Sequence, residues 1–146
     1  MGLLACKPSP DLTTDLFVLI ADTSQHYDEL RIRMLDLAAK TSWPIDSLGR
    51  SYNKAEDQIF LPSDWPDRAY AGQYFMRAFS GDALSLEYYA YYKDTLDVKD
   101  RTIALVACIS RDQIHARERL ERLQLYYPDA FLVKVEVSLA DVYHPQ

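Results

Sequence analysis

Residues 16–37 read LFVLIADTSQHYDELRIRMLDL, and residues 102–123 read TIALVACISRDQIHARERLERL. Each stretch opens with a short apolar run and continues with apolar residues spaced three and four apart. That pattern is typical of a buried strand followed by an amphipathic helix. The predicted inner face of the first helix carries Tyr27, Leu30, Met34 and Leu37.

The two stretches keep the same register when the first is displaced along the chain by 86 residues. Phe17 then falls on Ile103, and Ser24 falls on Ser110. This internal repeat predicts an α+β fold made of a pseudo-duplicated β–α–β unit, of the ferredoxin-like kind. We expect its two helices to pack on one face of a mainly antiparallel sheet.

Both predicted helices have polar residues at their starts. Ser24 is an expected N-cap of the first helix, and Ser110 is an expected N-cap of the second. Gln113 follows Ser110 by three residues, as in a capping box. Pro44 and Pro128 are expected to end the two helices.

The middle of the chain contains a long insertion and a further strand. Residues 54–82 hold prolines, glycines and scattered aromatic residues, which predict an irregular insertion between the two halves. Insertions of this length are often functional. Residues 83–92 alternate, with Leu84, Leu86 and Tyr88 on one side, and predict a strand with one buried face.

The beginning of the chain reads MGLLACKPSPD. The prolines favour an extended linker, so we expect a leader over residues 1–15 and a single α+β domain over residues 16–146. The run that ends at Cys6 is similar to the end of a bacterial lipoprotein signal, and we expect Cys6 to be a lipid attachment point. On this interpretation residues 1–5 are the remnant of a signal peptide.

Composition restricts the classes of function. The formal net charge of −6 disfavours nucleic acid as a partner, because the chain is repelled by phosphates. The chain has two cysteines and three histidines, and none of them follows the spacing of a metal site. No phosphate loop or nucleophile elbow is present. We therefore expect no catalytic residues, no metal and no cofactor, and a protein that is not an enzyme.

Aromatic residues offer the best candidate binding surface. The chain has eleven tyrosines, and tyrosine is common at recognition surfaces. If the polar face of the 83–92 strand is open, its tyrosines and residues of the insertion could stack on sugar rings or hold a protein. The candidate ligand-binding residues are Arg50, Trp65, Tyr70, Tyr74, Tyr89 and Tyr91. The alternative is that the insertion folds back over this face and makes these residues a second small core.

The stretch from residue 103 to residue 137 resembles the second half of a SPOR (sporulation-related repeat) domain. The shared features are a serine after the strand, small and leucine residues along one side of the helix, and a Pro-x-Ala turn. They are Ser110, Ala116, Leu120, Leu123 and Pro128-Asp129-Ala130 in this chain. The resemblance implies a sheet with one open face that binds peptidoglycan glycan strands.

Three functions stay open at this point. The first is a non-enzymatic lipoprotein of the bacterial cell envelope, facing the periplasm, with a SPOR-like module that binds peptidoglycan glycan or an envelope protein. In that case only the lipid at Cys6 would contact the membrane. The second is a soluble, cytoplasmic adaptor or immunity-type protein. The third is a small enzyme with its site in the 54–82 insertion.

Overall fold

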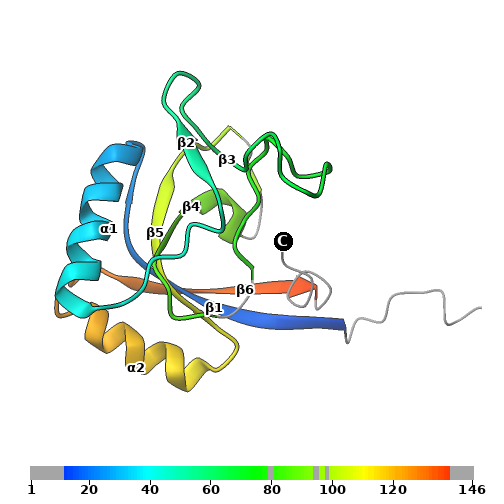
Figure 1. The fold of residues 1–146 in the computed structure, drawn as a ribbon. Coiled ribbons are helices and arrows are strands. Elements are labelled where there is room, and N and C mark those ends of the chain that lie inside the picture. Colours follow the sequence, from blue (N-terminus) through cyan, green and yellow to red (C-terminus); the bar gives the residue numbers. More distant parts are fainter. Residues whose placement is uncertain (1–11, 79–80, 94–95, 98, 139–146) are drawn as a thin grey trace, which may run out of the picture.

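The computed structural model describes residues 12–78, 81–93, 96–97 and 99–138. Its main sheet contains β1 (Thr13–Ser24), β4 (Ser85–Tyr88), β5 (Ile103–Ser110) and β6 (Phe131–Ser138) in the order β4-β5-β1-β6. Every pairing in this sheet is antiparallel. Helix α1 (Tyr27–Thr41) follows β1, and helix α2 (Gln113–Leu123) follows β5 (Figure 1). The predicted α+β class is confirmed, with the strand order of a ferredoxin-like fold.

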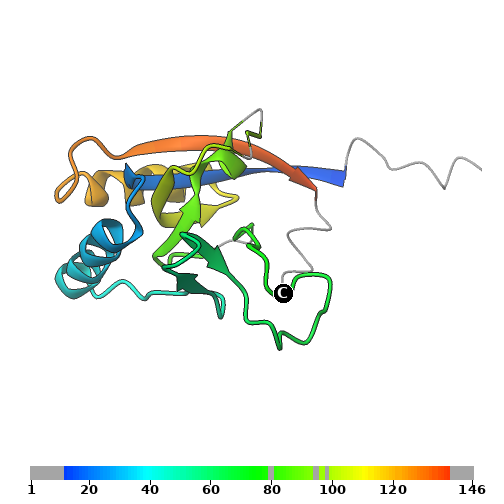
Figure 2. The same cartoon turned by 90° about the horizontal axis from the view of Figure 1, so that it is seen from above.

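The two helices lie against the same face of the sheet (Figures 1 and 2). Their inner residues interlock with the sheet residues that point toward them, and this layer forms the larger core. Its fully buried members include Leu19, Leu105, Leu30, Leu37, Ala116 and Leu123. Each large aliphatic side chain removed from water in this way contributes about 1.5–3 kcal/mol before entropy is counted.

The internal repeat is visible in the structure. Leu37 and its counterpart Leu123 are both completely buried. The hydroxyl of Ser24 accepts a hydrogen bond from the backbone N–H of His26 at 3.0 Å. The hydroxyl of Ser110 accepts one from the N–H of Asp112, also at 3.0 Å.

The two serines predicted as N-caps, Ser24 and Ser110, each lie two residues before the N-cap in the structure. The N-caps are His26 and Asp112, so Gln113 is the first residue of α2 rather than part of a capping box. The carboxylate of Asp112 accepts a hydrogen bond from the N–H of Ile114 at 2.9 Å, which makes Asp112 the cap. Ser110 instead shapes the turn that leads into the helix.

Strand β1 begins earlier than expected. Thr13 pairs with Ser138 and Asp15 with Glu136, so residues 13–15 belong to the sheet and not to a leader. Residues 1–11 of the predicted leader, including Cys6, lie outside the described residues.

The strand predicted over residues 83–92 is shorter than expected. Only Ser85–Tyr88 form β4, and the chain then turns into a short 3-10 helix, η3 (Tyr89–Tyr92). All four residues of β4 are buried, although alternation predicted one solvent-facing side. The reason is that the insertion covers the side that carries Glu87.

The insertion lies between α1 and β4, and it includes the hairpin β2 (Ser51–Asn53) and β3 (Gln58–Phe60). Before the hairpin, the chain pairs with the outer edge of β4, because the N–H of Leu84 donates to the carbonyl of Pro44 at 2.7 Å. The ring of Tyr52 then stacks on Tyr27 of α1, with ring centroids 4.0 Å apart. These contacts place the insertion around the β4 edge of the sheet (Figure 1).

Candidate functional site

Glu87 is the centre of a buried polar cluster beneath the insertion. Its side chain is fully buried, and its Oε1 lies 2.7 Å from Nη1 of Arg50. The same oxygen accepts hydrogen bonds from the hydroxyl of Tyr74 at 2.8 Å and from the N–H of Arg77 at 3.1 Å. The cluster therefore joins the insertion to β4 through two of the predicted ligand-binding residues, Arg50 and Tyr74.

The Arg50–Glu87 pair is ionised. Burial by itself raises the pKa of Glu87, but the charge and hydrogen bonds of Arg50 outweigh burial and lower that pKa below its usual range. Burial also raises the pKa of the Tyr74 hydroxyl well above its ordinary value, so this group donates its proton to Glu87. The guanidinium of Arg50 is thus occupied inside the protein, where a ligand on an open sheet face would not reach it.

Three other predicted ligand-binding residues lie apart from one another. Trp65 packs against Gly49, whose φ is +76° and where an added Cβ would lie 2.8 Å from the indole ring. Tyr70 packs edge-on against Phe75 at 4.5 Å between ring centroids. Tyr89 lies on the sheet face opposite the helices, with the ammonium of Lys93 4.7 Å from its ring centroid.

Tyr74 and Tyr91 meet in one pocket of about 80 Å³, which we call the tyrosine pocket. Its lining residues are Gln58, Tyr74, Tyr88, Tyr91, Asp97, Asp100 and Arg101. The volume is far below the roughly 300 Å³ of the smallest usual ligand cavities, so the pocket can receive the edge of a ring but cannot enclose a whole ligand.

The wall of the tyrosine pocket is aromatic. The ring of Tyr74 meets Tyr88 edge-on at 4.7 Å and Tyr91 at 4.9 Å between centroids. The hydroxyl of Tyr88 accepts a hydrogen bond from the N–H of Ile59 at 3.0 Å, which ties the wall to β3. These contacts hold the rings in place before any ligand arrives, which lowers the entropic cost of binding.

The rim of the pocket is polar. Hydrogen bonds from Thr102, followed by that from Lys93, lower the pKa of Asp100, so its carboxylate is charged at neutral pH. The guanidinium of Arg101 lies 5.2 Å from the centroid of Tyr88 and donates to the carbonyl of Asp57. The rim therefore holds both hydrogen-bond acceptors and donors beside an aromatic wall, a combination suited to a ligand with many hydroxyl groups.

Sequence reasoning named two of the three tyrosines in this pocket, Tyr74 and Tyr91, and none of its polar residues. Gln58 is in β3, and Asp97, Asp100 and Arg101 are in the connection between η3 and β5. That connection held none of the candidate ligand-binding residues. The available signal was its cluster of acidic and basic residues directly after a tyrosine-rich strand.

The sheet face opposite the helices is largely covered. Leu16, Val18 and Ile20 of β1 are buried there, with Tyr92 and Met76 packed against the same cluster. On β6, the valines of this face are only partly buried. The open face that the SPOR resemblance implies is therefore covered along β1 and β5 in the described part of the chain.

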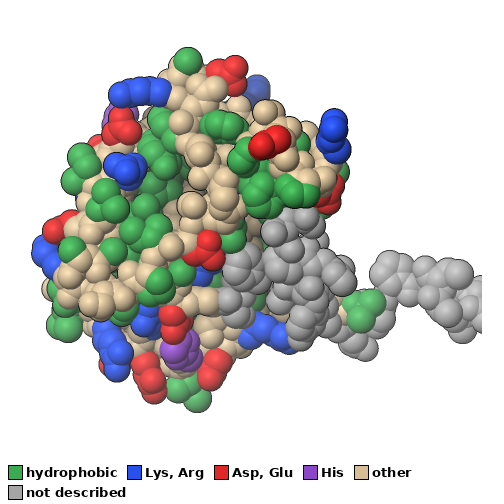
Figure 3. Space-filling model, viewed as in Figure 1, with side chains coloured by type: hydrophobic (Ala, Val, Ile, Leu, Met, Phe, Trp, Pro, Cys, Tyr) green, Lys and Arg blue, Asp and Glu red, His purple; other side chains and the backbone are tan. Residues whose placement is uncertain are grey.

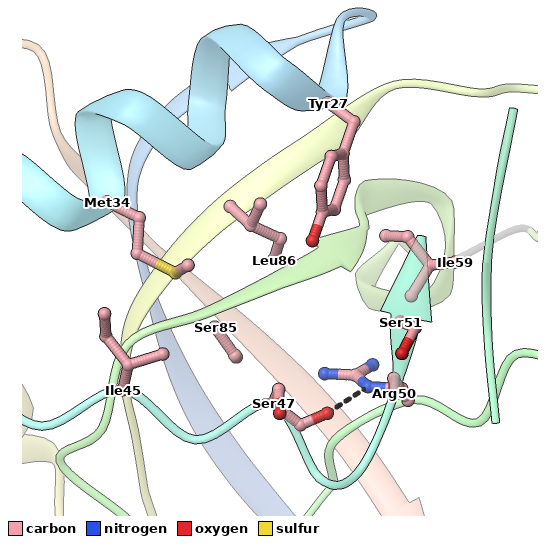
Figure 4. Close-up of a pocket in the computed structure, with 9 residues that line it drawn as sticks. All are labelled: Tyr27, Met34, Ile45, Ser47, Arg50, Ser51, Ile59, Ser85 and Leu86. Carbon is pink, nitrogen blue, oxygen red and sulfur yellow. Dashed lines mark hydrogen bonds between the residues drawn. The ribbon is translucent and has the colours of Figure 1, made fainter. Parts of the chain in front are cut away.

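A second hollow lies between α1 and the insertion, and Figure 4 shows Tyr27 and Met34 reaching into it from the helix. Arg50 Nε donates to the carbonyl of Ser47 at 2.9 Å on its far side. The space amounts to about 30 Å³, which is the volume of a single water molecule. This hollow is a packing gap and carries no ligand argument.

Charged side chains over α2 are mixed in sign, with blue and red atoms interspersed in Figure 3. Within the described residues, no helix has the length and apolar character needed to cross a bilayer.

Comparison of the chain with protein-family models, with curated proteins and with solved structures found no match.

Proposed function

We propose that this protein is a non-enzymatic module that binds a glycan at the tyrosine pocket. The observation that carries the proposal is the meeting of three tyrosine rings with Asp97, Asp100 and Arg101 in one pocket. Tyrosine rings pack against the C–H faces of sugars, while carboxylates and guanidinium groups exchange hydrogen bonds with hydroxyls.

The charge of the pocket favours a neutral polyhydroxylated ligand over a phosphate chain. Two carboxylates and one guanidinium line it, so its formal charge is negative. The negative pocket would repel the phosphates of a nucleic acid, whereas it would not repel an uncharged sugar. Peptidoglycan glycan is the candidate that the SPOR resemblance names, although binding at the tyrosine pocket differs from binding on an open sheet face.

Envelope localisation through a lipid on Cys6 belongs to the same proposal. It is tested by expressing the gene in its native host with a labelled fatty acid. Label recovered on the protein, and lost in a Cys6→Ser variant, supports the anchor. Equal labelling of both proteins, or no label on either, contradicts it.

Glycan binding is tested by calorimetric titration with soluble peptidoglycan fragments. Tyr91→Ala should weaken binding by at least about tenfold, because it removes one wall of the pocket. Tyr126→Ala is the matched control, since Tyr126 is exposed after α2 and outside the pocket. Equal affinity of the wild type and Tyr91→Ala, or no glycan binding by the wild type, would overturn the proposal. Binding of an envelope protein without any glycan binding would favour the protein-partner alternative instead.

A further inference from the structure

A second cluster of polar side chains lies near the end of β5, and it consists of Asp82, Cys108 and His115. The tyrosine pocket lies near the other end of the same strand, because its residues Asp100 and Arg101 precede β5. Asp82 Oδ1 is 3.2 Å from Cys108 Sγ and 2.9 Å from His115 Nε2. Together the three side chains offer one oxygen, one sulfur and one nitrogen, all within 4.8 Å of one another. Spacing along the chain gave no sign of this cluster, because Asp82 lies 26 residues before Cys108 and 33 before His115.

The backbone holds all three residues firmly. Gly81 and Ile109 exchange backbone hydrogen bonds at 2.8 and 2.9 Å, which places Asp82 beside Cys108 of β5. His115 is in the first turn of α2, three residues after the Asp112 cap. The guanidinium of Arg119, one turn further, donates to the carbonyl of Asp82 at 2.7 Å.

We propose that Asp82, Cys108 and His115 form a binding site for a divalent transition metal ion, with zinc as the best-matched ion. Sulfur, imidazole nitrogen and carboxylate oxygen are the ligands that zinc takes in proteins. Tetrahedral zinc bond lengths require ligand atoms about 3.3–3.6 Å apart, with the sulfur at the longer end. The two distances to Asp82, 2.9 and 3.2 Å, need to widen by a few tenths of an ångström. The sulfur of Cys108 and the nitrogen of His115, which lie within 4.8 Å of each other, need to come to the same spacing.

Access and charge both permit an ion to enter. The side chains of Asp82 and His115 are 42 % and 44 % exposed, while Cys108 is fully buried beneath them. The carboxylate of Asp82 and the thiolate that forms on binding bring two negative charges to the ion. Arg119, 3.9 Å from Asp82, and Arg77, whose charge also acts on Cys108, offset part of that attraction.

The binding step releases one proton. Asp82 is already a carboxylate, since hydrogen bonds from His115 and Cys108 overcome burial and lower its pKa. As a ligand, His115 offers the Nε2 lone pair and carries its ring proton on Nδ1. The Cys108 thiol loses its proton as the S–metal bond forms. Three protein ligands leave a fourth position for water, beside a pocket of about 200 Å³ lined by His115, Glu118, Arg119 and Arg122.

The site differs from a cysteine nucleophile. In a nucleophilic pair the imidazole takes the thiol proton, whereas here the thiol donates to Asp82. Burial, and next the hydrogen bond to Asp82, raise the pKa of Cys108 to about 12 without a metal. The thiol is therefore protonated and unreactive until an ion displaces its proton.

Cobalt(II) titration of an untagged Cys6→Ser chain tests the proposal, with zinc competition as the second readout. The result expected is one equivalent of cobalt with a thiolate-to-metal charge-transfer band, displaced by one equivalent of zinc. Cys108→Ser should abolish the band. Asp82→Asn and His115→Ala should weaken zinc binding by about tenfold or more.

Two control variants complete the experiment. His26→Ala removes the histidine at the start of α1, and Tyr91→Ala removes one wall of the tyrosine pocket. Both variants should bind metal with the affinity of the parent chain. Circular dichroism shows whether each variant is folded. If Cys108→Ser fails to fold, the exposed residues Asp82 and His115 decide the result. The absence of the band, or undiminished zinc affinity in both Asp82→Asn and His115→Ala, overturns the site.

Discussion

The guanidinium of Arg50 meets the carboxylate of Glu87 in a buried, two-pronged ion pair, with Nη1 and Oε1 2.7 Å apart. Their side chains are 3 % and 0 % exposed. Arg50 precedes the β2–β3 hairpin, and Glu87 is in β4, so the pair fixes the insertion onto the edge of the sheet. The walls of the tyrosine pocket depend on that attachment, because Tyr74 bonds to the same carboxylate.

Breaking this pair should be costly. We expect Arg50→Ala to lower the free energy of unfolding by about 3–5 kcal/mol, because it leaves Glu87 as an uncompensated buried charge. Urea denaturation followed by circular dichroism measures the change. Lys54→Ala is the matched control, since the Lys54–Asp28 pair is largely exposed and should contribute little. A loss in Arg50→Ala no larger than in Lys54→Ala would contradict this account of the insertion.

Acid should weaken the fold through the same carboxylate. The pKa of Glu87 is lowered in the folded protein, whereas the pKa of a glutamate in the unfolded chain is about 4.3. Its stabilising contribution is therefore complete above about pH 4.3 and is lost as the pH falls through the folded pKa.

The double variant Arg50→Met with Glu87→Gln tests this pH dependence. It removes both charges and keeps an oxygen acceptor for Tyr74, so its unfolding free energy should decline less steeply in acid. Denaturation midpoints from pH 7 down to pH 3 give the comparison. Asp82 and Asp100, whose pKa values are also lowered, account for the decline that remains. Parallel curves for the wild type and the double variant would be the contrary result.

Periodicity was sufficient to predict the fold because both strand–helix units bury their apolar residues on regular faces. The shift that pairs Leu37 with Leu123 also pairs His26 with Asp112, the two N-caps in the structure. The exact caps were not predictable, since a serine two residues earlier offers the same hydrogen-bonding chemistry. The end of β4 at Tyr88 was hidden for a different reason: the alternation continues through Tyr92, although the backbone turns into η3.

The pairing of the caps gives a stability prediction. His26 makes no side-chain capping bond, whereas its counterpart Asp112 does. His26→Asp should therefore raise the free energy of unfolding by about 0.5–2 kcal/mol, and Asp112→Ala should lower it by a similar amount. Thermal and urea denaturation of both variants measure the two changes. Destabilisation by His26→Asp would show that the two helix starts are not equivalent.

The residues of the tyrosine pocket and of the Glu87 cluster were harder to predict than the fold, because they are brought together by the tertiary structure. Arg50 and Glu87 are distant in sequence, and nothing local marked Arg50 as a buried partner rather than a surface cation. Asp100 and Arg101 become pocket residues only because the insertion carries Tyr74 across to them. Aromatic richness pointed to two residues of the tyrosine pocket, Tyr74 and Tyr91, but long-range contacts decide which rings meet there.

The location of the glycan site is the central functional claim. It is tested most directly by recording backbone amide NMR spectra of the ¹⁵N-labelled protein during titration with a soluble peptidoglycan disaccharide. The account predicts saturable shifts that are largest at Gln58, Tyr91 and Arg101, and that disappear in Tyr91→Ala but persist in Tyr126→Ala. Shifts centred on Val133 and Val135 of β6, or no saturable shifts at all, would contradict it.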